Sequence, residues 1–157
     1  SEEISWAISL IDSIRSARAQ MNVPAGAKVP LVQVSISPAG QAALSANMAQ
    51  IQQMARITEV SQVSEMPKGA ITITAPQATF GLPLADIIDV AAEKMRLEKN
   101  MGKLAKELGG LRGRLNNPNF AASAPAEVLA ETRANLEARE EEEAKLSIAL
   151  ARLEEIG

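Results

Sequence analysis

A leucine-type repeat runs through residues 87–115 and stops at an Asn-Asn-Pro-Asn segment, a combination that few folds accommodate. Its members recur mainly three and four positions apart, at Ile87, Val90, Leu97, Met101, Leu104, Leu108, Leu111 and Leu115. This spacing places one apolar seam along a helix, as in a coiled coil. Because Pro118 lacks a backbone donor and asparagines favour turns, we expect the helix to end there.

A second repeat starts after Ala124-Pro125 and matches the first one. Leucines occupy its heptad positions at Leu129, Leu136, Leu146, Leu150 and Leu153, while Thr132, Arg139 and Glu143 fill the remaining seam sites. Two antiparallel helices of one coiled coil satisfy both patterns. We therefore expect residues 86–157 to form an antiparallel coiled-coil arm, with its turn at residues 116–124. At about 1.5 Å per residue, the arm would be roughly 45–50 Å long and would project from a globular body.

Lys94 interrupts the seam of the first arm helix. If the turn centres on Pro118 and Asn119, Lys94 lies near Glu142, Glu143 and Lys145 across the hairpin. A polar contact there would fix the register of the two helices.

Residues 1–85 alternate helical and extended patterns. A helix is expected over residues 2–20, strands are expected over 29–36, 57–63, 70–75 and 78–82, and a further helix starts at Ser37-Pro38 and breaks near Asn47. This order predicts a small body with a mostly antiparallel sheet. The predicted fold class is therefore α+β, with the body at residues 1–85 and the arm at residues 86–157.

The helix expected at residues 2–20 has an apolar arc wider than half its circumference, and Arg15 and Arg18 lie inside that arc. One interpretation is that both side chains extend to water and complement the negative end of the helix dipole. The other is that they face a further body outside these residues. Both interpretations are open at this point.

The residue types that the chain lacks exclude most catalytic chemistry. It has no cysteine and no histidine, which removes thiolate nucleophiles, Ser-His-Asp arrangements, disulfides and ordinary zinc sites. No glycine-rich phosphate loop is present either. We expect a non-catalytic chain without a cofactor or metal of its own, although weak magnesium binding to its acidic surface stays open. Without a signal peptide or a long apolar run, a soluble cytoplasmic protein is expected.

Charge is distributed unevenly between the two arm helices. Residues 90–116 carry seven basic and three acidic side chains, whereas residues 124–156 carry four basic side chains and nine glutamates. The cations at Arg96, Lys99, Lys103 and Lys106 are spaced three, four and three apart, in one line opposite the seam. Such a line is typical of a surface that follows a phosphate backbone, and without aromatic residues it favours folded RNA. The alternative is a solvated face whose lysines pair with glutamates.

Gly109, Gly110 and Gly113 interrupt the helical pattern near the turn. Each glycine weakens a helix by roughly 1 kcal/mol relative to alanine, so the distal part of the arm is expected to be soft. Softness there would either help the arm to adapt to an RNA surface or be merely tolerated in a marginal coiled coil.

Several segments, taken in order, resemble one known family. They are residues 14–24 (IRSARAQMNVP), residues 82–89 (LPLADIID) followed by Glu93, Arg96, Leu97 and Lys99, and residues 115–120 (LNNPNF) followed by residues 124–128 (APAEV). Together they resemble the C-terminal end of bacterial valyl-tRNA synthetases, which are class I aminoacyl-tRNA synthetases. The glycines at positions 102, 109, 110 and 113 depart from the family, which more often has lysine, glutamate and alanine there.

The resemblance implies a tRNA-binding module of an enzyme that joins valine to tRNA(Val), using ATP and magnesium. The catalytic, editing and anticodon-binding domains would lie upstream in the same polypeptide, in a monomeric protein without membrane contact. By position, the candidate tRNA contacts at the tRNA elbow are Arg96, Lys99, Lys103, Lys106, Arg112 and Arg114. Arg15 and Arg18 become candidates for the domain junction or for tRNA.

A rival interpretation belongs to a different class of protein. The basic and acidic helices would form a structural or protein-interaction hairpin that oligomerises without RNA, by pairing with a complementary coil. Sedimentation with and without tRNA would separate the two interpretations.

Overall fold

The computed structural model describes all residues, 1–157, and they form two compact units. The globular unit contains Ser1–Glu93 together with Arg152–Gly157, and the arm contains Lys94–Ala151. The division into domains at residues 85 and 86 stays a prediction.

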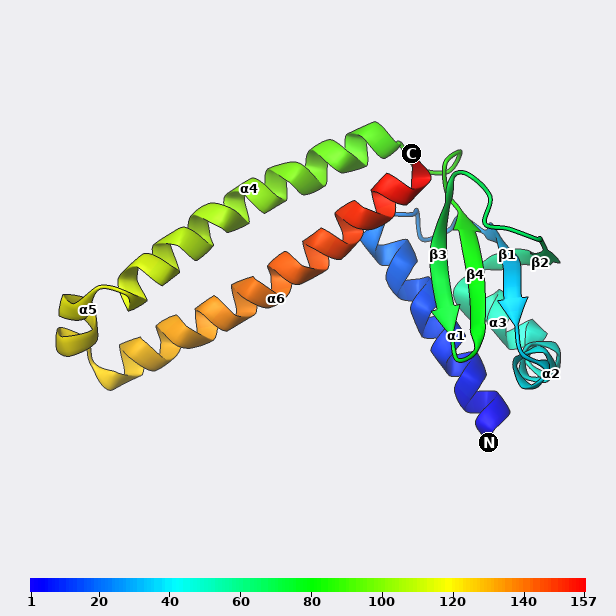
Figure 1. The fold of residues 1–157 in the computed structure, drawn as a ribbon, viewed down its shortest axis with the longest axis horizontal. Helices are drawn as coiled ribbons and strands as arrows, with labels where there is room; N and C mark the ends of the chain where they lie inside the picture. Colours follow the sequence, from blue (N-terminus) through cyan, green and yellow to red (C-terminus); the bar gives the residue numbers. More distant parts are fainter. The chain divides into compact units, whose positions relative to one another are not determined.

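The secondary structure follows the order expected from the sequence, with one additional helix (Figure 1). The elements are α1 (Glu2–Gln20), β1 (Val29–Ile36), α2 (Pro38–Ala46), α3 (Met48–Ala55), β2 (Ile57–Gln62), β3 (Ala70–Ala75), β4 (Ala78–Pro83), α4 (Val90–Leu115), α5 (Pro118–Ser123) and α6 (Ala126–Ile156). None of the helices combines the length and the apolar character that crossing a membrane requires.

A four-stranded sheet in the order β2-β1-β4-β3 is the framework of the globular unit. Strand β4 pairs antiparallel with β1 and β3. Strands β1 and β2 run parallel, because the crossover through α2 and α3 returns the chain in the same direction. The predicted α+β class and the mostly antiparallel sheet are confirmed.

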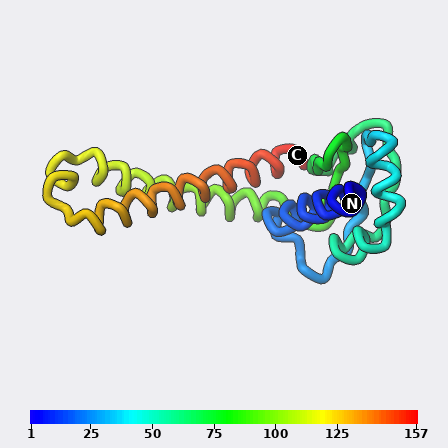
Figure 2. Tube along the Cα trace, turned by 90° about the horizontal axis from the view of Figure 1, so that it is seen from below, coloured from blue at the N-terminus to red at the C-terminus, as the bar shows by residue number.

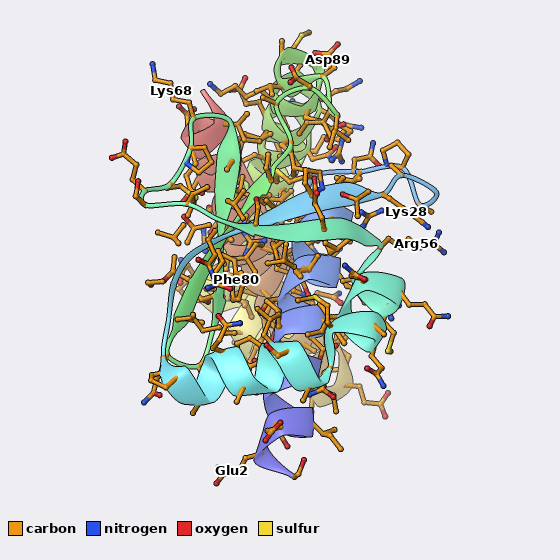
Figure 3. All side chains as sticks on the ribbon, turned by 90° about the vertical axis from the view of Figure 1, so that its right-hand side faces the viewer. Glu2, Lys28, Arg56, Lys68, Phe80 and Asp89 are labelled. Atoms are coloured by element: carbon orange, nitrogen blue, oxygen red, sulfur yellow. The ribbon has the colours of Figure 1, made fainter.

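Helices α1, α2 and α3 cover one face of this sheet, and Phe80 lies between the two layers (Figure 3). Side chains alternate along a strand, so Phe80 and Leu82 point to the same face, and neither has exposed surface. Trp6 of α1 packs against Phe80 with 6.1 Å between the ring centroids. Its Nε1 donates a hydrogen bond of 2.9 Å to the carbonyl of Pro76, so the indole is both packed and satisfied.

The loop between β2 and β3 packs on the opposite face of the sheet. A Cβ added at Gly81 would lie 2.5 Å from Met66 Sδ and 2.9 Å from Val32 Cγ2. Only glycine allows this close approach of Met66 to strand β4.

Capping side chains explain where the body helices begin. Ser1 Oγ accepts a hydrogen bond of 3.2 Å from the amide of Ile4, and Ser37 Oγ accepts one of 3.1 Å from Gly40. The expected break near Asn47 is confirmed, since this residue ends α2 and precedes α3.

The last turn of α6 belongs to the globular unit. Leu153 is fully buried, and Glu155 Oε2 accepts a hydrogen bond of 2.8 Å from the amide of Thr72. Thr72 lies on β3, an edge strand whose outer amides have no neighbouring strand. Arg152 Nη1 also donates to Gln20 Oε1 at the end of α1. The contact of Glu155 with Thr72 covers part of an edge that would otherwise be open to pairing with another chain.

In the arm, α4 and α6 run antiparallel and side by side, as Figures 1 and 2 show. The seam of α4 is buried, with at most 7% exposure at Leu97, Leu104, Leu108 and Leu111. The seam of α6 is more polar and includes Thr132, whose Oγ1 donates 2.7 Å to the carbonyl of Val128. The predicted antiparallel coiled coil is therefore confirmed.

The start of α4 differs from the prediction. The helix begins at Val90, so Ile87 precedes it and is not part of its seam. Asp89 Oδ1 accepts a hydrogen bond of 3.0 Å from the amide of Ala92 and caps the helix. The apolar repeat did not reveal this boundary, because a turn that precedes a helix can also carry apolar residues.

The connection between the long helices contains α5, which the sequence analysis did not predict. Asn117 Oδ1 accepts a hydrogen bond of 3.0 Å from the amide of Asn119, and Pro118 is the first helical residue. An asparagine followed by proline therefore ends one helix and starts the next, because it supplies a cap and a preset backbone angle.

Candidate nucleic-acid interface

The four cations predicted as a line on α4, Arg96, Lys99, Lys103 and Lys106, are all exposed and form what we term the basic stripe. Helix α6 covers the seam of α4, so coiled-coil packing leaves the opposite face at the surface. Arg114 continues the same line, because Gly110 and Arg114 follow Lys106 in steps of four residues. The sequence-predicted contacts therefore share one face, apart from Arg112.

Arg112 lies on the flank of the seam and interacts with the acidic helix. Its Nη2 is 3.7 Å from Glu140 Oε2, and both side chains are about half exposed, at 48% and 50%. An ion pair of this kind holds the arginine toward α6 and away from the basic stripe. Arg112 is thus the predicted contact that the structure separates from the others.

The ion pairs of the arm leave most of this basic face unpaired. Besides Arg112 with Glu140, they join Arg139 to Glu107 at 3.6 Å and Arg139 to Glu142 at 3.1 Å. None of these pairs involves Lys99, Lys103, Lys106 or Arg114. Pairing with glutamates therefore does not neutralise these four positions.

A hollow of about 330 Å³ lies beside one member of the stripe. It is lined by Asn100, Lys103, Leu104, Glu107, Arg139, Glu142 and Leu146. Two carboxylates near Lys103 reduce the positive potential around it. Lys99 and Lys106 do not line this hollow.

The register of the arm differs from the expected one. Glu142 lies beside Asn100 and Lys103, and residue 123 is halfway between the paired Glu107 and Arg139. Lys94 is six residues before Asn100, or about 9 Å along the helix axis. The expected contact of Lys94 with Glu142 is therefore wrong, because α5 moves the centre of the hairpin beyond Pro118 and Asn119.

Arg15 and Arg18, one turn apart on α1, have different environments. Arg15 is exposed, whereas Arg18 is only 7% exposed and donates from Nη2 to the carbonyls of Pro24 at 3.2 Å and Ala27 at 2.7 Å. Burial lowers the pKa of Arg18, and the charge of Arg56 lowers the same pKa further. The guanidinium still stays protonated in ordinary buffers. Extension to water is thus wrong for Arg18, which instead ties down the loop after α1.

Arg56 is a basic residue that the sequence analysis missed. It ends α3 in the left-handed conformation, with φ 54° and ψ 53°, and lines a hollow together with Arg15 and Arg18. Arg56 is about forty positions from Arg15 and Arg18 in the chain, and a local pattern could have identified it only as a polar residue after a helix.

The structure offers no cluster of three or more acidic, histidine or cysteine side chains that could hold a metal ion.

Comparison with known proteins agrees with this geometry. Residues 89–154 match the family described as the valyl tRNA synthetase tRNA binding arm. The chain is 62% identical over 155 residues to a valine–tRNA ligase of Ruegeria pomeroyi. The aligned region covers 99% of the chain and 15% of that relative. It is 55% identical over 154 residues to the enzyme of Cereibacter sphaeroides (98% of the chain, 16% of the relative). It is 41% identical over 155 residues to that of Agrobacterium fabrum (99% and 16%).

The chain spans about one sixth of the length of these relatives. The matched region, residues 89–154, contains α4 with the basic stripe, the turn with α5, and nearly all of α6. Residues 89–154 are thus the part of the chain that is similar to the valyl tRNA synthetase tRNA binding arm.

Proposed function

We propose that this chain is the tRNA-binding module of a valine–tRNA ligase and that the basic stripe contacts the backbone of tRNA(Val). The observation that carries the proposal is the line of exposed cations on α4, within the residues that match a tRNA-binding arm. Because no aromatic side chain accompanies the stripe, it recognises phosphates by charge and shape and does not read bases.

The arm contributes affinity and orientation. Each lysine or arginine placed near a phosphate releases a condensed counterion, which favours binding without sequence preference. Contact at the tRNA elbow would hold the molecule so that its anticodon and acceptor ends reach their sites in other domains of the same cytoplasmic polypeptide. Those domains would bind ATP and magnesium and would join valine to tRNA, whereas this chain would position the tRNA.

A charge-matched pair of double variants tests the stripe. We expect Lys99→Gln with Lys106→Gln to weaken tRNA binding several-fold, because each change removes one phosphate contact. The slope of log affinity against log salt concentration should fall in magnitude by roughly 1.4 to 1.8, as for two lost contacts. Fluorescence anisotropy with labelled tRNA over a salt series measures both quantities.

The control is Arg133→Gln with Lys145→Gln, two exposed cations on α6. It makes the same change in net charge on the other helix of the arm. Equal loss of affinity in both double variants would show that tRNA responds to net charge alone, and the assignment to the basic stripe would then be rejected.

A second candidate function is a hairpin that associates with a second copy of itself. It is favoured by Val128 and Ile148 on α6, which are 40% and 50% exposed, beside helices of opposite charge. Sedimentation velocity over a range of protein concentrations decides between the two. Dimerisation that Ile148→Ser abolishes, with no change on adding tRNA, would support the hairpin and exclude the tRNA module.

A further inference from the structure

A second positively charged feature lies on the globular unit. It is a hollow of about 480 Å³ between the end of α1, the loop that follows α1, and the end of α3. Its lining residues are Arg15, Arg18, Ala19, Val23, Ala25, Gln53, Met54 and Arg56. Three of the eight are arginines and none is acidic, so the hollow concentrates positive charge without a counterion from the chain.

Arg18 supplies a buried donor with no partner. Its Nη2 is engaged by the carbonyls of Pro24 and Ala27, but Nη1 is buried and makes no hydrogen bond. Leaving a buried charged donor unsatisfied costs free energy, and such groups are rare in folded proteins. Because Arg18 lines the hollow, its guanidinium brings there a hydrogen-bonding capacity that the chain itself does not use.

Arg56 and Arg15 are the other two arginines that line the hollow. The carbonyl of Arg56 accepts a hydrogen bond of 3.1 Å from the amide of Val29, which fixes the backbone of Arg56 beside the start of β1. Figure 3 shows Arg56 and Lys28 at the same edge of the globular unit, with Lys68 at the opposite edge. Arg15 precedes Arg18 by three positions on α1, which places both side chains on one face of the helix.

We propose that Arg15, Arg18 and Arg56 form a site for a phosphate group, separate from the basic stripe. Guanidinium groups match the oxygens of phosphate with paired hydrogen bonds and remain charged at every working pH. A phosphate offers acceptors in several directions, as three arginines from two helices require, whereas a carboxylate offers only two oxygens in one plane. The phosphate comes either from an RNA backbone or from a free phosphate compound.

Binding also relieves repulsion within the site. Arg56 lowers the pKa of Arg18 through its charge, in addition to the larger effect of burial, so the two cations disfavour each other. A bound dianion reverses this repulsion, because opposite charges in a partly buried site attract strongly.

The first experiment uses the 157-residue chain and inorganic phosphate as the probe. Arginine Nε–Hε signals are followed by NMR while phosphate replaces chloride at constant ionic strength, and acetate is titrated in parallel. We expect saturable shifts of the Arg18 and Arg56 signals with phosphate and a much weaker response to acetate. No saturable shift, or an equal response to acetate, would overturn the site.

Arg56→Gln is the test variant, because Arg56 is exposed and its long polar replacement keeps the backbone. Loss of one charged hydrogen-bond donor should weaken phosphate binding about tenfold, read from the Arg18 signal. Lys68→Gln makes the same charge change at the opposite edge and should leave affinity unchanged. Equal effects of the two variants would overturn the proposal. Arg18 itself is left intact, because it holds the loop at residues 24–27.

A second measurement identifies the source of the phosphate. If the RNA backbone occupies the site, Arg56→Gln also weakens tRNA binding, additively with Lys99→Gln and Lys106→Gln, whereas Lys68→Gln does not. Unchanged tRNA affinity together with lost phosphate binding assigns the site to a free phosphate compound. The phosphate titration contains no RNA, so its outcome is separate from that of the stripe experiment.

Discussion

The globular unit and the arm differ in how much apolar surface stabilises them. Of twelve large side chains that are less than 2% exposed, eleven lie in the globular unit and one, Leu108, lies in the arm. The globular core is closed by two layers, whereas the arm buries one seam in which α6 contributes Thr132 and Arg139. A thin seam stabilises less but leaves nearly every other side chain available to a partner. The globular unit is therefore stabilised mainly by its buried core, whereas the arm exposes most of its side chains to a binding partner.

The largest expected effect is in the core of the globular unit. Phe80→Ala should lower the free energy of unfolding of this unit by about 3–5 kcal/mol, because the ring is fully buried against Trp6. Trp6 is the only tryptophan, so its fluorescence during urea unfolding reports on this unit. If Phe80→Ala left the fluorescence midpoint in place, the two-layer core would not be what stabilises the unit.

The matching change in the arm is Leu108→Ala, with an expected loss of about 2–3 kcal/mol. The value is lower than for Phe80 because the side chain is smaller and the thin seam can partly collapse around the gap. Far-UV circular dichroism should show the shift, while Trp6 fluorescence should not. A common shift of both probes would mean that arm and globular unit unfold together, and the contrast between them would fail.

Alanine substitutions at one glycine of the arm and one glycine of the globular unit should have opposite effects on stability. Gly110→Ala should stabilise the arm by about 1 kcal/mol, because alanine is the better helix former and nothing lies within 4 Å of the added Cβ. Gly81→Ala should destabilise the globular unit, because the new Cβ would lie 2.5 Å from Met66 Sδ. Thermal unfolding followed by circular dichroism and by Trp6 fluorescence measures the two effects. The same direction of change at both glycines would contradict the packing described.

The smallest expected effect concerns a surface ion pair of the arm. Arg112→Ala should change stability by about 0.2–1 kcal/mol, because both partners of the pair with Glu140 are half exposed and solvent screens them. A double-mutant cycle with Glu140→Ala in urea isolates the pair. A coupling free energy well above this range would show that ion pairs, and not the leucine seam, hold the arm together.

Much of the fold was predictable because its signals act over a few residues. The period of Leu97, Leu104 and Leu111 defines one helix face, and Ser1 and Ser37 cap their helices through hydrogen bonds three residues away. The basic stripe was predictable for the same reason, since the helical period fixes which side chains share a face. Local signals were ambiguous at α5, where Asn117 and Pro118 read as a stop although they also start a helix.

Contacts between distant segments determined the rest. Spacing along α1 identified Arg15 and Arg18, but packing brought Arg56 to them and buried Arg18 with an unsatisfied donor. Packing likewise set the register of the arm and placed the end of α6 against β3, where Glu155 meets Thr72. The physical reason is that periodicity and caps depend on neighbours in the chain, whereas register, burial and charge clusters depend on which segments exclude water together.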